Sequence, residues 1–388
     1  MDSKNCGIVL YDHTSIGRYI WPYDTYGRFA RAFLLPLLEE GVTQYIKNAR
    51  TNLMILAIDG LPIPITCSYS NYDDSYVCSS YTHYVSYLLH ELNKIEVSSS
   101  QRVKNAIALK TFGAFLRLAR LNQTIHVNNW LLSTNLYPNL TPSQIQRVAE
   151  YVTARFPNHG VVFRSINEKT TASLMEVLPP LGYALVASRP VYIFPGCSLH
   201  RIKKSHRRHI KRDHEMLQDT GYELMRPADF REEHVPRMLE LYNLLCIERH
   251  SPMNPQLTEK FFLNLIRNRP LELYGLKKCG RMDGIMGYFD FAGTMVTPIV
   301  GYDTSLPRSA GLYRMISSLA LDIALQNGLI DHAGAGVGSF KRRRGYLPVM
   351  EYSAVDVRHL SALRRSAWSL IRTVGERVVI PYIQRFKL

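Results

Sequence analysis

The sequence lacks the cysteine spacing of a metal or redox site. Its six cysteines are scattered, and no two of them are separated by two residues. A C-x-x-C pair is the usual sign of a zinc site or a thioredoxin-like motif. We therefore expect no metal ion in this protein, and thiols that stay reduced in the cytoplasm.

Long hydrophobic runs are missing as well. No segment approaches the roughly 18 consecutive apolar residues that a transmembrane helix needs. The N-terminal residues MDSKNCGIVLYDH carry an early acid and no apolar core of signal-peptide length, which argues against a secretory signal. These absences predict a cytoplasmic protein without a transmembrane segment.

Acidic residues are few compared with basic ones. The 388 residues include 47 Lys and Arg but only 32 Asp and Glu, which gives a net charge of +15. Such an excess favours a polyanionic partner, namely RNA, DNA or an anionic membrane surface. The alternative is a cytoplasmic protein that is basic for no functional reason. The length suggests two domains or one large one.

The first half of the chain alternates between strand and helix patterns. Two strand-like runs, Leu53–Ile58 and Leu61–Ser68, flank an Asp-Gly turn, which is a strong hairpin signal. Thr141-Pro142 favours a helix start, with the Thr as cap and the Pro as first residue. Further helices are expected at 102–121 and 169–178, and strands at 160–166 and up to Phe194.

The second half repeats this order. Strands are expected at 271–277, 284–291 and 295–302, followed by a helix at 309–326, a short strand at 328–330 and a last strand at 349–357. In addition, Leu181-Gly182-Tyr183 in the first half matches Arg344-Gly345-Tyr346 in the second. This match suggests a duplication.

The most unusual stretch is Gly334–Ser353. Glycine stands at every second position at its start, and the basic run Lys341–Arg344 follows. Glycine at this density disfavours a helix and lets the backbone approach a ligand closely. Four consecutive cations require an anionic partner or solvent, so a solvated basic turn is the alternative.

Phe340-Lys341 followed by Gly345, after a helix and a strand and before the last strand, resembles the C-terminal signature of the GNAT acyltransferase superfamily. The branch that it is most similar to is that of the Fem-type peptidyltransferases, which use aminoacyl-tRNA, and their FemAB-like acetyltransferase relatives. The resemblance covers most of residues 53–357. It implies an α/β fold of tandem GNAT-like domains, each a mixed twisted sheet flanked by helices.

On this basis we divide the chain into four parts. These are a lead-in (1–50), a first GNAT-like domain (51–198), a second (199–357) that begins with a basic helical junction (199–220), and a C-terminal amphipathic helix (358–388). The terminal helix is expected to pack on the protein, with a membrane-surface helix as the alternative.

The resemblance also implies a catalytic lysine. In Fem-type enzymes the lysine of the FK motif contacts the donor near the reacting carbonyl, which gives this role to Lys341, with Phe340 packing beneath it. From the residues themselves, His250 is a candidate to orient or deprotonate an amine, because its ordinary pKa is near neutral. Asp303, at the end of a strand, is a candidate to hold an ammonium group. A surface histidine in a turn is the alternative for His250.

A basic surface is expected at the junction and at the end of the glycine stretch. It either contacts a polyanion or is a solvated face. The residues that we predict to contact tRNA phosphates are Lys203, Lys204, Arg207, Arg208, Lys211, Arg342, Arg343 and Arg344.

A different acyl donor would use the segment before the 309–326 helix. CoA-dependent GNAT enzymes carry a loop here that wraps the pyrophosphate at a helix N-terminus. Arg308, Ser309, Ala310 and Gly311 would hold CoA in that case. However, Tyr313 fills the second small position of the family pattern, and an ordinary cap at Ser309 explains the same residues.

Three hypotheses about function follow. The first is a Fem-like transferase that passes an aminoacyl group from aminoacyl-tRNA to an amine or hydroxylamine of a small molecule or peptide, with no further cofactor. The second is an acyl-CoA-dependent GNAT N-acyltransferase. The third is a non-catalytic RNA-binding protein with this fold.

Overall fold

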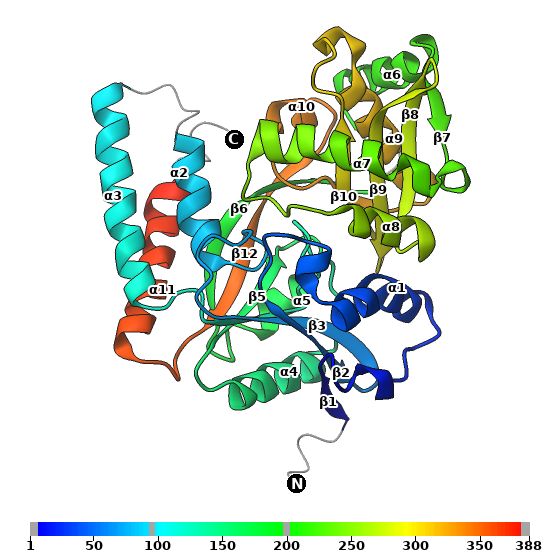
Figure 1. Cartoon of the computed structure of the whole chain (residues 1–388). Coiled ribbons are helices and arrows are strands. Elements are labelled where there is room, and N and C mark those ends of the chain that lie inside the picture. The colour runs from blue at the N-terminus through cyan, green and yellow to red at the C-terminus, as the bar shows by residue number, and fades with distance from the viewer. Residues whose placement is uncertain (1–6, 93–97, 197–201, 382–388) are drawn as a thin grey trace.

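Twelve strands form one continuous sheet in the computed structural model, which describes residues 7–92, 98–196 and 202–381 (Figure 1). The strands are β1 (Ile8–Tyr11), β2 (Asn52–Ile58), β3 (Leu61–Ser68), β4 (Thr124–Val127), β5 (Gly160–Ile166), β6 (Ala184–Phe194), β7 (Glu223–Met225), β8 (Glu272–Lys278), β9 (Arg281–Phe291), β10 (Thr294–Tyr302), β11 (Ile330–His332) and β12 (Leu347–Asp356).

Helices flank this sheet. They are α1 (Thr25–Glu40), α2 (Tyr87–Leu92), α3 (Ser99–Leu118), α4 (Pro142–Arg155), α5 (Ala172–Val177), α6 (Lys204–Asp219), α7 (Val235–Tyr242), α8 (Glu259–Arg267), α9 (Leu312–Gln326), α10 (Gly338–Arg342) and α11 (Ala362–Val374), with the π-helices η8 (Asn243–His250) and η10 (Gly375–Val379) and the 3-10 turn η9 (Arg308–Ala310). The predicted α/β class is confirmed.

Local signals in the first half produced the predicted elements. β2 and β3 pair in register across the Asp-Gly turn. The side chain of Thr141 accepts a hydrogen bond from the backbone N–H of Gln144, and the Gln144 side chain accepts one from the backbone of Thr141. This capping box, with Pro142 at the first helical position, explains why α4 begins where it does.

The two halves of the chain exchange their last strands. The sheet order is β1-β2-β3-β4-β5-β12-β6-β11-β10-β9-β8-β7, in which only β4·β5 and β10·β11 are parallel. β12, from the end of the second half, therefore pairs with β5, while β6, from the end of the first half, pairs with β11. β12 and β6 also pair with each other along nearly their whole length at the centre. This arrangement agrees with a duplicated unit.

The two exchanged strands begin with the same turn. Gly182 (φ 93°) and Gly345 (φ 90°) each precede a buried tyrosine that leads into the strand. The N–H of Tyr183 donates to the carbonyl of Leu178, and the N–H of Tyr346 donates in the same way to the carbonyl of Lys341. A left-handed backbone of this kind favours glycine. The sequence match that suggested a duplication is thus also a match in structure. In this match, Lys341 of the second half is at the position equivalent to Leu178 of the first half.

The sheet runs without a break across the predicted boundary at 198/199, so neither linear range holds a complete set of neighbouring strands. The predicted lead-in belongs to this fold, since β1 pairs with β2. In addition, α1 packs on α8 of the second half, with the rings of Phe33 and Phe261 6.0 Å apart. The four-part division stays a prediction.

Two expectations about helices were wrong in detail. The helix expected from residue 309 begins at Leu312, because Gly311 has a φ of 70° and ends the preceding turn η9. The glycine stretch was expected to be non-helical, but its second part forms the short helix α10 after Val337. Gly334 and Gly336 have a positive φ in the loop before α10, and Gly345 has one after it, so the left-handed glycines flank this short helix rather than interrupt it.

The C-terminal helix packs on the protein, as expected. Ala367, Trp368 and Ile371 of α11 lie in a cluster with residues of α3 and β12. Residues 382–388 of this predicted segment, and 199–201 of the basic junction, lie outside the described residues. In the described ranges, no helix combines the length and apolar character needed to cross a membrane.

Candidate active site

A cavity of about 380 Å³ lies where β10 and β11 part. The two strands pair over only three residues, from Thr294 to Val296 on β10. Beyond Val296 the pairing of β10 with β9 is irregular, and Pro298 of β10 has no N–H for a partner strand. The opening between central strands is therefore a consequence of the β10 sequence.

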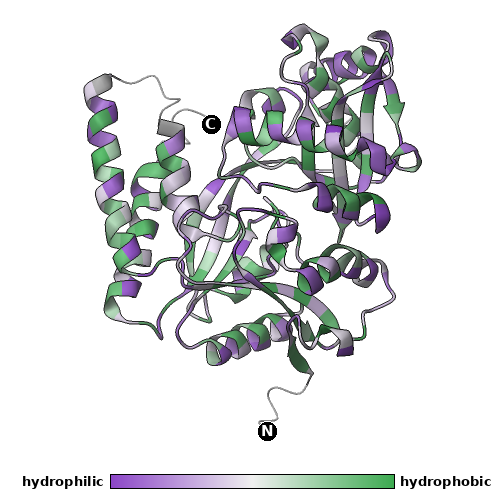
Figure 2. Ribbon diagram, in the orientation of Figure 1, coloured by the Kyte–Doolittle hydropathy of each residue, from purple (hydrophilic) through white to green (hydrophobic). Residues whose placement is uncertain are grey.

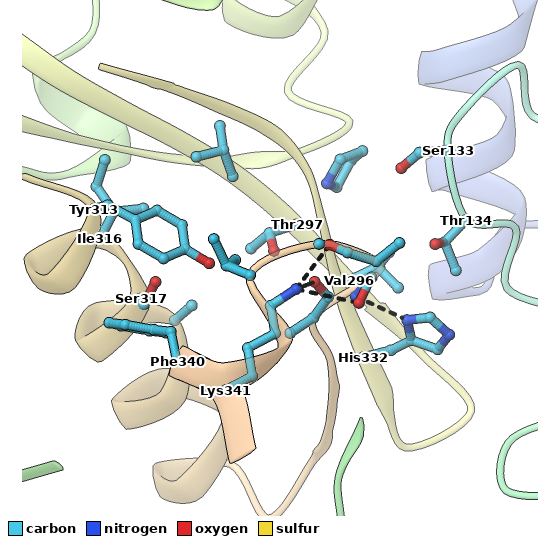
Figure 3. A pocket seen from close by; sticks show the side chains of 18 of the residues that line it. Ser133, Thr134, Val296, Thr297, Tyr313, Ile316, Ser317, His332, Phe340 and Lys341 are labelled. Atoms are coloured by element: carbon cyan, nitrogen blue, oxygen red, sulfur yellow. Dashed lines mark hydrogen bonds between the residues drawn. The ribbon is translucent and has the colours of Figure 1, made fainter. Parts of the chain in front are cut away.

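Both halves of the chain line this cavity. Its wall residues include Val296, Thr297 and Val300 of β10, Tyr313, Ile316 and Ser317 of α9, Asp331 and His332 of β11, the loop 333–337, Phe340 and Lys341 of α10, Ile210 and Asp213 of α6, and Tyr76, Tyr87, Ser133, Thr134 and Arg189 from the first half. Figure 3 shows the amine of Lys341 between the α9 residues on one side and His332 on the other.

The Lys341 ammonium is buried and held by the glycine loop. Its side chain is 4% exposed. Its Nζ donates to the carbonyl oxygens of Ala333 at 2.7 Å, Ala335 at 2.9 Å and Gly334 at 3.2 Å. These carbonyls converge because Gly334 and Gly336 adopt left-handed backbone conformations that turn the loop around the amine. The loop and the lysine therefore form one unit.

Burial has a large effect on this amine. It lowers the pKa of Lys341 to about 7, and the nearby Asp331 carboxylate acts in the opposite direction. The equivalent position in the first half is Leu178, which is fully buried. The fold thus accepts a hydrophobic residue at this position, and burying a cation there costs free energy that the carbonyl contacts only partly return.

Asp331 and His332 lie beside Lys341 on β11. The Asp331 carboxylate accepts a short hydrogen bond from the Tyr346 hydroxyl through Oδ2, while Oδ1 has no partner among the described residues. Burial raises the pKa of Asp331 to about 6. Burial also lowers the pKa of His332 to about 4, so its ring is neutral at pH 7. A carboxylate with a free oxygen can accept a proton here, whereas His332 cannot hold one.

His332 is a hydrogen-bond donor in this arrangement. Its Nδ1 accepts from the backbone N–H of Gly334 at 3.3 Å, which leaves the proton on Nε2. No described residue accepts from that Nε2–H. On the first-half side of the cavity, Arg189 pairs with the buried Glu351 at 3.0 Å and donates to the carbonyl of Ser133. The cavity therefore offers donors on both sides of the amine.

The predicted catalytic residues separate into two groups. Phe340 lies next to Lys341, with its ring 4.9 Å from that of Tyr313, and His250 lines the cavity in η8. Asp303 does not line the cavity. It is buried in ion pairs with Arg237 at 2.8 Å and with Arg281, and its pKa is lowered to about 2 despite burial. These partners already neutralise Asp303, so its position does not favour the predicted contact with a substrate ammonium group.

The predicted basic surface is largely present. Lys203, which caps α6, and Lys204, Arg208 and Lys211 of α6 are exposed and Arg207 is half-buried, while Arg343 is also exposed. His206 of α6 contacts the carbonyl of Arg343 at 2.9 Å, so the two basic segments touch.

Arg342 and Arg344 differ from this expectation. Arg342 donates to the Tyr192 hydroxyl at 2.8 Å and is half-buried. Arg344 is 7% exposed, pairs with Asp213, and lies over the Phe340 ring. An arginine held inside the protein in this way supports the site from within, and its burial does not favour the predicted contact with tRNA phosphates.

The predicted CoA loop is covered by another helix. Arg308 and Ser309 are exposed, but Gly311 is buried, and a Cβ built on it would lie 2.1 Å from the sulfur of Met216 in α6. The N–H of Gly311 already donates to the carbonyl of Arg308 at 3.1 Å. Arg314, in the first turn of α9, pairs with Asp213 of α6 at 2.7 Å. The N-terminus of α9 therefore faces α6 rather than solvent.

Sequence reasoning missed Asp331, His332, Arg189 and Glu351. The first two come directly after the strand expected at 328–330, and only the strand pairing reveals that they belong to β11 and line the cavity. Arg189 and Glu351 are 162 residues apart and meet through the exchanged strands. Among the described residues, no group of three His, Cys, Asp or Glu is placed to hold a metal ion.

No protein-family model and no curated protein matches this chain. Solved structures similar to it include L-PGS from Bacillus licheniformis (15% identity, 61% of this chain and 79% of that chain, TM-score 0.44) and FemX (9%, 60% and 80%, 0.43). A GCN5-related N-acetyltransferase from Kribbella flavida is also similar (15%, 61% and 81%, 0.32). With TM-scores below 0.5, these similarities do not carry an argument about activity.

The burial of Lys341 predicts a pH-dependent stability. Its folded-state pKa of about 7 lies below its ordinary value of 10.5, so the unfolded chain binds more protons between the two. Stability from this group therefore rises with pH there, by at most about 1.4 kcal/mol per pH unit. We expect urea unfolding to show that the free energy of unfolding of the wild type rises, relative to that of Lys341→Leu, between pH 7 and pH 9. Any advantage of the leucine variant at pH 7 should therefore become smaller at pH 9 or change sign. A constant difference would contradict the lowered pKa.

Proposed function

We propose that this protein is an acyltransferase that moves an aminoacyl group from aminoacyl-tRNA to an amine or hydroxylamine. The observation that carries the proposal is the buried Lys341 ammonium in a cavity at the opening between β10 and β11. A cation buried where the other half of the fold carries leucine is costly, and such sites are commonly functional.

The chemistry follows from the groups around the cavity. The acceptor nitrogen, as a free amine, attacks the ester carbonyl of the donor and forms a tetrahedral intermediate with a negative oxygen. Lys341 stabilises that oxygen when one of its N–H groups turns away from the loop, and the carbonyl of Gly334, at the longest distance, is the contact most easily given up. A charge placed in advance at a developing oxyanion contributes roughly 3–4 kcal/mol.

Proton transfer is assigned to Asp331. Its free Oδ1 accepts the proton that the attacking nitrogen loses, and Asp331 passes this proton to the departing ribose oxygen when the intermediate collapses, which returns the carboxylate to its ionised form. Its pKa of about 6 suits a base that works near neutral pH. Because Lys341 must stay protonated while Asp331 is ionised, activity is limited to the narrow interval around these two pKa values.

The tRNA donor is supported by how α6 lies against the site. The inner side of α6 provides Ile210 and Asp213 to the cavity wall, and its outer side exposes Lys204, Arg208 and Lys211. A nucleic acid that binds the outer side with its phosphates can therefore extend its 3′ end toward Lys341.

The CoA alternative is less well supported because α6 covers the N-terminus of α9. A pyrophosphate needs free backbone N–H groups at a helix N-terminus. Here the Gly311 N–H is already used, and Met216 occupies the space in front of it. The third hypothesis, a non-catalytic RNA-binding protein, gives no reason for the burial of Lys341.

A donor assay tests the proposal. The protein is incubated with a panel of amines and either tRNA charged with labelled amino acids or labelled acetyl-CoA, with and without RNase. We expect transfer from charged tRNA that RNase abolishes, and none from acetyl-CoA. Acetyl transfer that survives RNase would establish the CoA alternative, and tRNA binding without transfer of any amino acid would establish the third hypothesis.

Salt dependence tests the role of α6. Each phosphate contact contributes about 0.7–0.9 to the slope of log K against log salt concentration. Lys204→Glu/Arg208→Glu/Lys211→Glu is expected to weaken tRNA binding and to reduce that slope by about 2–3. Lys104→Glu/Lys110→Glu, on the distant helix α3, serves as the charge-reversal control and should leave the slope unchanged. An unaltered slope in the α6 variant would assign its cations to a solvated face.

A further inference from the structure

Helix α3 is apolar on two faces, and the protein covers only one of them. The inner face packs Leu109, Phe112, Phe115 and Leu116 against α11 and the sheet. Figure 1 shows α3 at the outer edge of the molecule beside α2 and α11. A helix that is apolar on both faces needs a second apolar environment for the face that the protein leaves open.

The outer face is exposed over the length of the helix. Val103 is 58% exposed, Ile107 60% and Leu118 71%. With the exposed Ala114, these residues recur at intervals of four or seven and so form one stripe. Figure 2 shows apolar and polar bands alternating along this outer helix. We call Val103, Ile107, Ala114 and Leu118 the outer stripe.

The charged side chains of α3 have one sign. Lys104 and Lys110 are exposed next to it, and Arg117 lies near its C-terminal end. The sequence of α3, Ser99–Leu118, contains no Asp or Glu. A surface that combines aliphatic side chains with cations alone is complementary to a surface that is apolar inside and anionic outside.

We propose that the outer stripe of α3 binds an anionic lipid bilayer. The aliphatic side chains enter the boundary between headgroups and acyl chains, and the two lysines contact the lipid phosphates. A helix of 20 residues is about 30 Å long, so it can lie flat on the bilayer over its whole length. This inference does not depend on the proposed function.

The side chains favour a bilayer over RNA. RNA-binding surfaces use aromatic rings to stack on bases, whereas the outer stripe is aliphatic. The cations available for phosphates are more numerous on α6, at the other side of the molecule (Figure 1). The two surfaces therefore divide into one suited to nucleic acid and one suited to lipid.

Helix α2 connects α3 to the cavity. Tyr87, the first residue of α2, lines the cavity, and α2 packs on α3. His90 of α2 contacts the carbonyl of His250 in η8 at 3.0 Å. A protein bound through α3 would therefore hold the cavity at a fixed distance from the membrane surface.

Co-sedimentation of the full chain with vesicles tests the proposal. The vesicles contain phosphatidylcholine alone or a 3:1 mixture of phosphatidylcholine and phosphatidylglycerol, where the ratio is about that of a moderately anionic membrane. We expect binding to the mixed vesicles only. Val103→Ser/Ile107→Ser/Leu118→Ser and, separately, Lys104→Glu/Lys110→Glu should each lower the partition coefficient by about tenfold or more.

Two controls make the result specific. Ile20→Ser/Tyr23→Ser removes two other exposed hydrophobic side chains, 80% and 85% exposed, from the segment that leads into α1. Lys204→Glu/Arg208→Glu reverses two exposed cations on α6, the same number as in the α3 variant. Both should bind the vesicles like the wild type.

Several results would overturn the proposal. These are no binding of the wild type to the mixed vesicles, equal losses in the Ile20→Ser/Tyr23→Ser control, or a serine variant of α3 that binds like the wild type while the glutamate variant does not. The last outcome would show a purely electrostatic surface, open to RNA or an acidic protein.

Discussion

The site depends on one buried ammonium group that three backbone carbonyls surround. Lys341 is nearly inaccessible to water, and the carbonyls of the glycine loop are its closest acceptors. The Lys341 amine donates to three successive carbonyls of the loop, so the loop and the lysine hold each other in place. Taking a cation out of water is unfavourable unless polar groups replace the solvent, which explains why a glycine-rich loop precedes α10.

The strand exchange is what brings the remaining groups to that lysine. Because β6 lies next to β11 and β12 lies next to β5, residues of the first half form one wall of a cavity in the second. The turn that the two halves share shows where they differ. Four residues before the equivalent glycines Gly182 and Gly345, the first half has Leu178 in its core and the second half has Lys341 at the cavity.

Local signals in the sequence were enough to predict much of the fold but only part of the site. The Asp-Gly hairpin and the capping box at Thr141 depend on neighbouring residues, and both were predicted. The burial of Lys341 and the pairing of Arg189 with Glu351 depend on strands far apart in the chain, which no local pattern reveals. For the same reason, Asp303 and Arg344 looked available from the sequence, although each is paired inside the protein.

The most direct test of this account is a single-turnover measurement on Lys341→Leu, which copies the residue of the equivalent position in the first half. Since the fold accepts leucine there, the variant should remain folded, as judged by circular dichroism and urea unfolding. We predict that its rate of acyl transfer falls by roughly two to three orders of magnitude, because one oxyanion-stabilising charge is lost. A folded Lys341→Leu variant with the rate of the wild type would contradict the account.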